Sequence, residues 1–220
     1  MESLVRDVSL LLKKGNEVII VSSGAVGCGR NVIDLVGGIG IKQAQAAVGQ
    51  VKLMGEFVRA FSQKDLHVAQ FLLNVEDLNS ERKENIFAAY KNLGGRAITI
   101  VNENDVTAIG ELSFGDNDNL AAEILEKFDF DILLILTEKG ALIRGGQQLM
   151  FSNSFSVGSY DCIASNDGYG FGGLDSKLAI AKRVVGMNKE IIIGKSGDNI
   201  LDILQGKAKA TFFDYMKMSH

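Results

Sequence analysis

Short apolar runs of β-type residues alternate with amphipathic stretches along most of the chain. Apolar residues that recur every three or four positions predict helices, which we expect at residues 2–14, 41–62, 81–93, about 119–128, 175–186 and near 199–205. Continuous apolar runs predict buried strands, which we expect at residues 17–21, 67–73, 97–101, 131–136, 190–193 and 210–213. Residues 145–173 are rich in Gly, Ser and Asn, and we expect them to be irregular.

Strands that alternate with helices are typical of an α/β fold with a mainly parallel sheet and helices on both faces. The sequence therefore predicts a three-layer αβα sandwich. No linker or repeat divides the 220 residues, so we expect a single domain over residues 1–220. The helix expected at 41–62 has a face of small residues, which we expect to pack on the internal sheet. This face comprises Ala44, Ala46, Ala47 and Gly49.

Polar segments follow four of the expected strands. They are Ser22-Ser23-Gly24, Asn102-Glu103-Asn104-Asp105, Thr137-Glu138-Lys139 and Gly194-Lys195-Ser196. Open α/β sheets bind ligands at the carboxyl ends of their parallel strands. We therefore expect these segments, which are far apart in the sequence, to build one functional edge.

Composition and charge exclude several classes of function. The 23 basic and 27 acidic residues are evenly mixed, which argues against nucleic acid as the main partner. No apolar run reaches the ~18–20 residues of a membrane helix, and the charged N-terminal stretch does not fit a signal peptide. Cys28 and Cys162 lack disulfide or metal spacing, and His67 and His220 are far apart. We expect no His-based metal site and a reduced, cytoplasmic protein.

Two familiar motifs fail on their context. Residues 168–173 fit the G-x-G-x-x-G pattern, but no convincing strand precedes them, as a dinucleotide site requires. Gly194-Lys195-Ser196 resembles the end of a Walker loop, but Lys189 stands where that loop needs its first glycine. We interpret Lys195 and Ser196 as part of an ordinary turn after a strand.

Three other segments carry candidate chemistry, and each has a plainer alternative. Residues 22–25 can form a nest of backbone amides for an anionic oxygen, or only a tight turn. Residues 104–105 and 116–118 suit an ammonium group, a metal or a positioning network, or they form a solvated acidic loop. Residues 172–177 form a Gly-rich turn that opens a helix. A positive charge at a helix N-terminus is unfavourable because of the helix dipole, so Lys177 indicates a nearby anion such as phosphate. The alternative is that Lys177 is a flexible surface lysine.

Five sequence segments occur together in one order between about Leu4 and Phe213. They are VSSGAVGCGR, KQAQAAVGQ, VNENDVTAIGELSFGDNDNLAAE, LTEKGAL and GFGGLDSK. In this order they closely resemble the glutamate 5-kinase family of the amino acid kinase superfamily. The resemblance implies transfer of the γ-phosphoryl group of ATP to the side-chain carboxylate of glutamate. The product would be γ-glutamyl phosphate, the first committed intermediate towards proline.

The resemblance also implies roles for residues on the glutamate side. Ser23 and Gly24 would hold the substrate near its reacting carboxylate. Asp105 and Asn117 would bind glutamate, with Asp105 suited to the α-ammonium group. Asp118 would orient the catalytic lysine.

On the nucleotide side, the resemblance implies that Thr137 and Glu138 contact the nucleotide. A glycine loop would cover the ATP phosphates, and its residues are Phe171, Gly172, Gly173, Leu174, Asp175, Ser176 and Lys177. Lys177 would act on the transferring group. A glutamate carboxylate with a pKa of ~4.3 is ionised at pH 7, so this reaction needs no general base. It needs positioning and compensation of phosphoryl charge, which Gly-rich amides, lysine and Mg²⁺ with ATP would supply.

The chain also departs from the family's usual pattern. It opens at the helix after the family's first strand, so we expect an N-terminally truncated domain without that strand and its Lys-x-Gly turn. We also expect no RNA-modification-type domain of the kind that follows in some members. Glu138 stands where the family usually has Asp, and Phe171 and Leu174 stand where it usually has Thr and Met. These departures leave the activity of this chain open.

Three hypotheses about function therefore follow from the sequence. The first is a glutamate 5-kinase, and the second is a non-catalytic or weakly active relative that binds glutamate, proline or nucleotide. The third is another branch of the superfamily, against which the NEND and FGDND segments argue. Family resemblance further implies a homo-oligomer, either a dimer or a tetramer, and feedback inhibition by proline.

Overall fold

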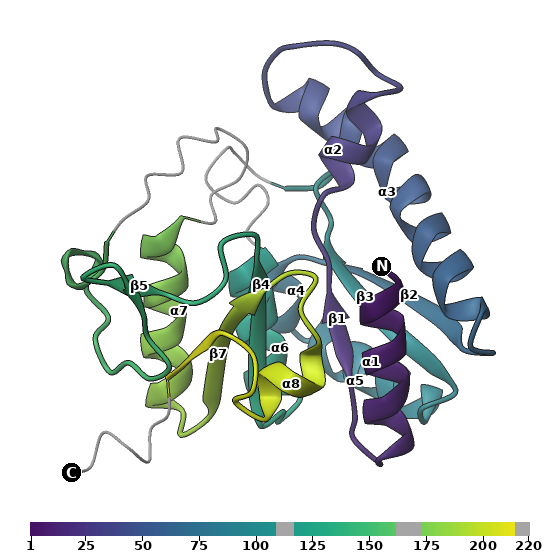
Figure 1. The fold of residues 1–220 in the computed structure, drawn as a ribbon. Coiled ribbons are helices and arrows are strands. Elements are labelled where there is room, and N and C mark those ends of the chain that lie inside the picture. Colours follow the sequence, from purple (N-terminus) through teal and green to yellow (C-terminus); the bar gives the residue numbers. More distant parts are fainter. Residues whose placement is uncertain (109–116, 162–172, 214–220) are drawn as a thin grey trace. The chain divides into compact units, whose positions relative to one another are not determined.

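The computed structural model describes residues 1–108, 117–161 and 173–213. Contacts divide the chain into two compact units, Met1–Leu120 and Ala121–His220. Each unit has a three-stranded sheet (Figure 1). Each unit also has a hydrophobic core of its own.

The sheet of the first unit contains three parallel strands in the order β1-β3-β2. β1 spans Ile19–Val21, β2 spans His67–Leu73 and β3 spans Ala97–Glu103. Residues 98–103 of β3 are all buried, which is typical of a central parallel strand with both faces covered. Because the strands are parallel, their carboxyl ends meet at one edge of this sheet.

Two helices of the first unit, α1 (Glu2–Lys13) and α3 (Ile39–Ser62), pack against the same core. Their apolar faces meet alternate residues of β3, and the buried members of this core are Val5, Val8, Met54, Phe57, Phe61, Ile98 and Ile100. The short helix α4 (Val75–Leu78) and helix α5 (Arg82–Leu93) connect β2 to β3. The helical periodicity of the sequence thus predicts α1, α3 and α5 to within two residues at each end.

The short helix α2 (Ala25–Arg30) crosses α3 at backbone contact distance. A Cβ atom on Gly49 would lie 1.7 Å from the carbonyl oxygen of Ala25, and one on Gly29 would lie 1.8 Å from that of Gln45. Only glycine fits at these two positions. The prediction that the small-residue face packs on the sheet is therefore wrong for Gly49, whose neighbour is α2. The larger residues further along α3 contact the sheet instead.

The sheet of the second unit has the strand order β4-β7-β8. β4 (Ile132–Thr137) and β7 (Glu190–Lys195) are parallel, and β8 (Ala210–Phe213) is antiparallel to β7. The Cα partners Thr137 and Lys195 lie at the carboxyl ends of the two parallel strands.

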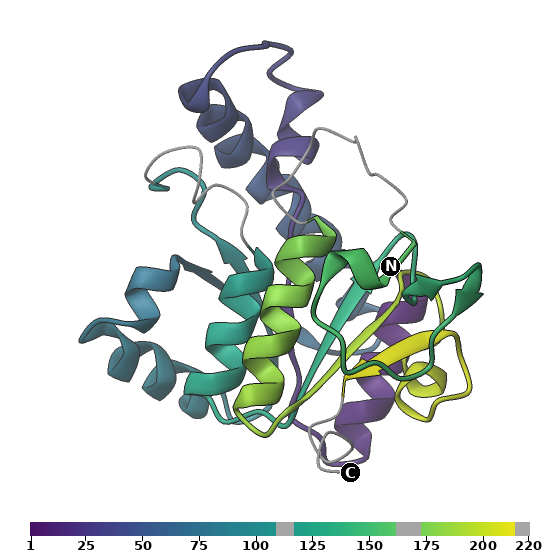
Figure 2. The same ribbon diagram turned by 90° about the vertical axis from the view of Figure 1, so that its left-hand side faces the viewer.

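Helices cover both faces of this second sheet. On one face, α6 (Asn117–Lys127) and α7 (Leu174–Gly186) lie side by side (Figure 2). Their buried contacts with the sheet include Ala122, Leu125, Leu178, Ala181, Val184, Ile191 and Ile193. On the other face, α8 (Ile200–Leu204) packs Ile203 against Ile192 and Phe212. Successive residues of β7 thus point to opposite faces of the sheet and contribute to two different cores.

Residues 143–159 contain more structure than the sequence predicts. This stretch contains a hairpin of two short strands, β5 (Ile143–Arg144) and β6 (Gln147–Gln148). It also contains a 3₁₀ turn, η1 (Val157–Ser159). The predicted fold class is confirmed: parallel strands alternate with helices that cover the sheets. Among the described residues, no helix combines the length and apolar character needed to cross a membrane.

Candidate functional site

The carboxyl end of β1 leads directly into the predicted substrate loop. The backbone N–H of Ser22 donates to the carbonyl of Val101 at 2.8 Å, which extends the pairing of β1 with β3 by one residue. Ser23 and Gly24 follow and are exposed. Gly24 has a φ of 100°, in the left-handed region that favours glycine, and it begins α2. The sequence folds sharply here because glycine allows this turn.

The loop after β3 is held by hydrogen bonds on two sides. The N–H of Asn104 donates to the carbonyl of Leu73 at the end of β2, at 3.1 Å. The side chain of Asn74 donates to Thr107 Oγ1 at 2.9 Å, and Gln43 of α3 donates to the carbonyl of Ala108 at 3.3 Å. These contacts fix the backbone on either side of Asp105.

Asn117 is tied to the same strand end. Its Oδ1 accepts a hydrogen bond of 3.0 Å from the backbone N–H of Glu103. Asn117 starts α6, and Asp118 follows in the first turn of that helix. The structure thus brings Asn117 to the end of β3, fourteen positions away in the sequence. The neighbouring residue Asp116 lies outside the described residues.

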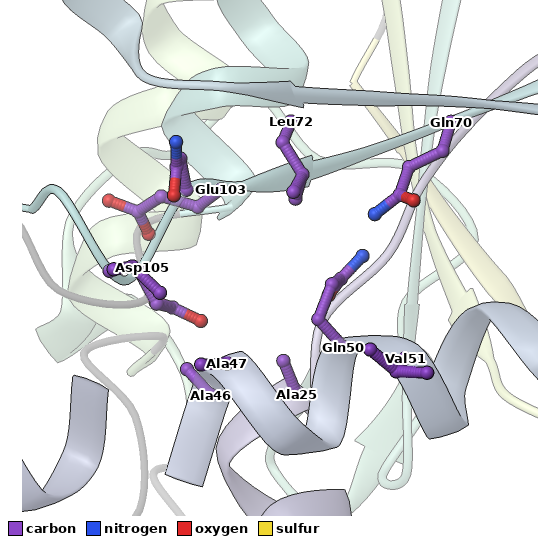
Figure 3. A pocket seen from close by; sticks show the side chains of 11 residues that line it. Ala25, Ala46, Ala47, Gln50, Val51, Gln70, Leu72, Glu103 and Asp105 are labelled. Carbon is purple, nitrogen blue, oxygen red and sulfur yellow. The ribbon is translucent and has the colours of Figure 1, made fainter. Parts of the chain in front are cut away.

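A pocket of about 310 Å³ opens at this edge of the first unit. Figure 3 shows Asp105 and Gln50 at different sides of it, with Ala25, Ala46 and Ala47 between them on α2 and α3. The remaining lining residues come from α3, β2, the end of β3 and the loop after it: they are Val51, Gln70, Leu72, Glu103, Asn104 and Val106. The volume suits a small molecule, and the lining combines carboxylates, amides and small apolar groups.

Asp105 is a buried acid of the pocket. It is 7% exposed, and no hydrogen-bond partner reaches its Oδ1 from residues 1–108, 117–161 or 173–213. Burial raises the pKa of this carboxyl to about 6. Because a buried carboxylate without a partner is costly, the site favours a ligand that carries a positive charge.

Gln50 is a pocket residue that the sequence did not single out. It is 8% exposed, and its Oε1 accepts a 2.6 Å hydrogen bond from Asn102 Nδ2. A glutamine on an amphipathic helix usually faces solvent, so the helical pattern does not point to a buried role for Gln50. The one available signal was its place at the end of AAVGQ, a segment that carries the family resemblance.

In the second unit, a compact turn follows β4. The N–H of Gly140 donates to Thr137 Oγ1 at 2.8 Å, and the N–H of Ser196 donates to the carbonyl of Thr137 at 2.8 Å. A Cβ atom on Gly140, whose φ is 78°, would lie 2.9 Å from that of Lys195. Thr137 is therefore held at the carboxyl ends of β4 and β7, whereas Glu138 is exposed.

The predicted glycine loop is described from Gly173 onwards, and Phe171 and Gly172 lie outside the described residues. Gly173 precedes α7, whose first turn contains Leu174, Asp175, Ser176 and Lys177. Leu174 packs against the core of the second unit, and the N–H of Lys177 donates to the carbonyl of Gly173 at 3.3 Å. Lys177 thus lies in the first turn of a helix, as the sequence predicts.

The predicted site residues fall into two groups. Ser23, Gly24, Asp105 and Asn117 lie at one edge of the first sheet, because Gly24 precedes Ala25 of the pocket and Asn117 contacts Glu103. The predicted nucleotide residues belong to the second unit, whereas Asp118 belongs to the first. The pairing of Asp118 with the catalytic lysine therefore stays a prediction. Within the described ranges, no group of three or more His, Cys, Asp or Glu side chains could hold a metal ion.

The sequence profile described as "Amino acid kinase family" matches residues 1–195. The chain belongs to the amino acid kinase family. It is 35% identical to a protein named glutamate 5-kinase from Citrifermentans bemidjiense, in an alignment that covers 97% of the chain and 61% of that protein. It is 36% identical to a glutamate 5-kinase from Microcystis aeruginosa, over 99% of the chain and 62% of that protein.

These matches confirm the resemblance that the motifs predicted. The chain spans about three fifths of the length of these curated relatives. Among solved structures, UMP kinase from Ureaplasma parvum is similar in fold, with a TM-score of 0.59, 12% identity, and coverage of 97% of this chain and 88% of that one. At this identity the likeness supports the α/β kinase fold alone.

Proposed function

We propose that this protein transfers the γ-phosphoryl group of ATP to the side-chain carboxylate of glutamate and forms γ-glutamyl phosphate. The observation that carries this proposal is the 35% identity to a glutamate 5-kinase over 97% of the chain. The pocket of the first unit supports it, since a small site with a buried acid suits an amino acid that carries an ammonium group.

Each predicted residue has a role in this reaction. Asp105 binds the α-ammonium group, because the ligand's positive charge compensates its buried carboxylate. Asn117 holds glutamate from the start of α6, while Ser23 and the amide of Gly24 hold it near the reacting carboxylate. The carboxylate itself is the nucleophile and is ionised at neutral pH, so no side chain has to remove a proton.

In the second unit, Thr137 and Glu138 contact the nucleotide, and the loop that leads into α7 covers its phosphates. Lys177, oriented by Asp118, compensates the charge that develops on the transferring phosphoryl group. Mg²⁺ arrives on the ATP phosphates as part of the substrate.

The proposed function also suggests an inhibitor, an oligomeric state and a cellular compartment for the protein. γ-Glutamyl phosphate leads towards proline, so proline is the candidate inhibitor, and we expect it to compete with glutamate. We expect a homo-oligomer, which light scattering would detect. ATP as substrate and a free Cys28 both fit the cytoplasm.

The decisive assay is formation of γ-glutamyl hydroxamate from glutamate, ATP, Mg²⁺ and hydroxylamine. We expect Lys177→Met to lower kcat by about 10²–10³-fold, because one preorganised stabiliser of the transition state is lost, with little change in KM for glutamate. Lys182→Met is the matched control, since this exposed lysine lies further along the same helix. Hydroxamate formation that does not depend on glutamate, or equal activity of both variants, would contradict the proposal.

A further inference from the structure

The orientation of the Gln50 side chain is fixed by its neighbours. Asn102 Oδ1 accepts a 3.0 Å hydrogen bond from the backbone N–H of Glu103, so Asn102 turns its Nδ2 towards Gln50. Nδ2 is a donor, and it therefore meets the Oε1 of Gln50 at 2.6 Å. This arrangement leaves the Nε2 group of Gln50 as the end that is not engaged by Asn102.

That Nε2 group is a buried donor without an acceptor among the residues that the structure describes. Gln50 is 92% buried, and Figure 3 shows its terminal nitrogen directed away from α3 into the pocket. Buried polar groups are nearly always satisfied, so an exception calls for a physical explanation, and a bound molecule that supplies the acceptor is one. The unsatisfied groups of the pocket thus include a donor, Gln50 Nε2, and an acceptor, Asp105 Oδ1.

An α-amino acid carries the complement of these two groups. Its ammonium is a donor and a cation, and its α-carboxylate is an acceptor and an anion. Resting on the proposed function, we propose that Gln50 is a specificity-determining residue that donates an N–H from Nε2 to the α-carboxylate of glutamate. Asp105 and Gln50 then recognise the amino-acid head group together, and Asn102 holds the amide in the orientation that this requires.

Gln50→Glu tests this role with little change in shape. The variant keeps an oxygen for Asn102 Nδ2 and replaces the N–H donor with a carboxylate oxygen. Gln70→Glu is the matched control, because Gln70 lines the same pocket from β2 but is exposed. Both variants convert an amide of the pocket to a carboxyl group of similar shape, so Gln70→Glu reports the effect of a new acid at an exposed position and Gln50→Glu its effect at the buried donor.

The measurement is calorimetric binding of two ligands, L-glutamate and its α-amide, to the 220-residue chain. We expect Gln50→Glu to weaken glutamate binding by about 10–100-fold, the scale of one hydrogen bond to a charged group. Binding of the α-amide should change less than about 3-fold or improve, since its NH₂ group can donate to the new carboxylate. In Gln70→Glu, both ligands should change by the same small factor. Circular dichroism and urea unfolding serve as the check that each variant is folded.

Equal weakening of both ligands in Gln50→Glu, or unchanged glutamate binding, would overturn the role of Gln50. Should that variant not fold, Gln50→Met is similar in length and uncharged, and it must also reduce the preference for glutamate over the α-amide. An unchanged preference in Gln50→Met overturns the inference equally. If the wild-type chain binds ATP but neither ligand, the proposed function itself is wrong, and the two failures are thereby distinguished.

Discussion

Gly49→Ala should damage the first unit far more than its single methyl group suggests. The new Cβ would lie 1.7 Å from the oxygen of Ala25, 2.8 Å from its carbonyl carbon and 2.5 Å from the nitrogen of Gly29. All three atoms belong to the backbone of α2, so no side-chain rotation relieves the contact. α2 must move away from α3 instead.

The size of the effect follows from two opposing terms. Alanine in place of glycine inside a helix is favourable by about 1 kcal/mol. Overpacking typically costs about 1–3 kcal/mol, and a collision with backbone lies at or beyond the upper end. We therefore expect a net loss of about 2 kcal/mol or more in the free energy of unfolding. Since Ala25 follows Gly24 and lines the pocket, glutamate binding should weaken as well.

Gly55→Ala supplies the matched control on the same helix. Gly55 is exposed, and a Cβ atom there meets nothing within 4 Å. This variant should gain about 0.5–1 kcal/mol from helix propensity alone. Urea unfolding followed by circular dichroism measures both variants. If Gly49→Ala is as stable as Gly55→Ala and binds glutamate normally, the close crossing of α2 and α3 does not exist in solution.

Two further predictions concern charge. Because the pKa of Asp105 is raised to about 6, glutamate affinity should be level above pH 7 and fall about 10-fold by pH 5, whereas Asp105→Asn should show no such slope in calorimetry. Without ligand, the free energy of unfolding has the opposite pH dependence. It falls as the pH rises through about 6, because the folded protein must then bury the ionised carboxylate of Asp105. Arg183 donates to Glu123, whose side chain is 8% exposed, so Arg183→Met should cost about 1–3 kcal/mol in urea unfolding. Arg59→Met, which breaks an exposed pair with Glu56, should cost less than about 1 kcal/mol, and equal losses would refute the argument.

The elements that the sequence predicts best are those whose apolar pattern is continuous. β2 occupies residues 67–73 as predicted, and α5 begins and ends within one residue of its expected bounds. The expectation that Asp105 and Asn117 serve one site rests on the family resemblance, and the structure places Asn117 against Glu103, two residues before Asp105. The pattern is less informative at strand ends, where β3 extends to Glu103 through polar residues that the sequence suggested as loop.

The features that the sequence could not predict depend on tertiary contacts. α2 contains two glycines and has little helix propensity, yet it forms where Gly29 lets it approach α3. Gln50 is buried for the same reason: the packing of its neighbours, rather than its own polarity, decides its exposure. Both features depend on contacts between segments that are far apart in the sequence, and such contacts cannot be predicted from a single sequence.

The order of strands in the first sheet has a consequence for synthesis of the protein. Ile19 pairs with Thr99 and His67 pairs with Ala97, so β3 is the last of these strands to be made and yet lies between the other two. No pair in this sheet can form until residue 97 and its successors have left the ribosome. Until then, the apolar faces of α1 and α3 have no β3 to cover them. A nascent chain in this state folds slowly, because distant segments must meet first, and it exposes surface that chaperones bind.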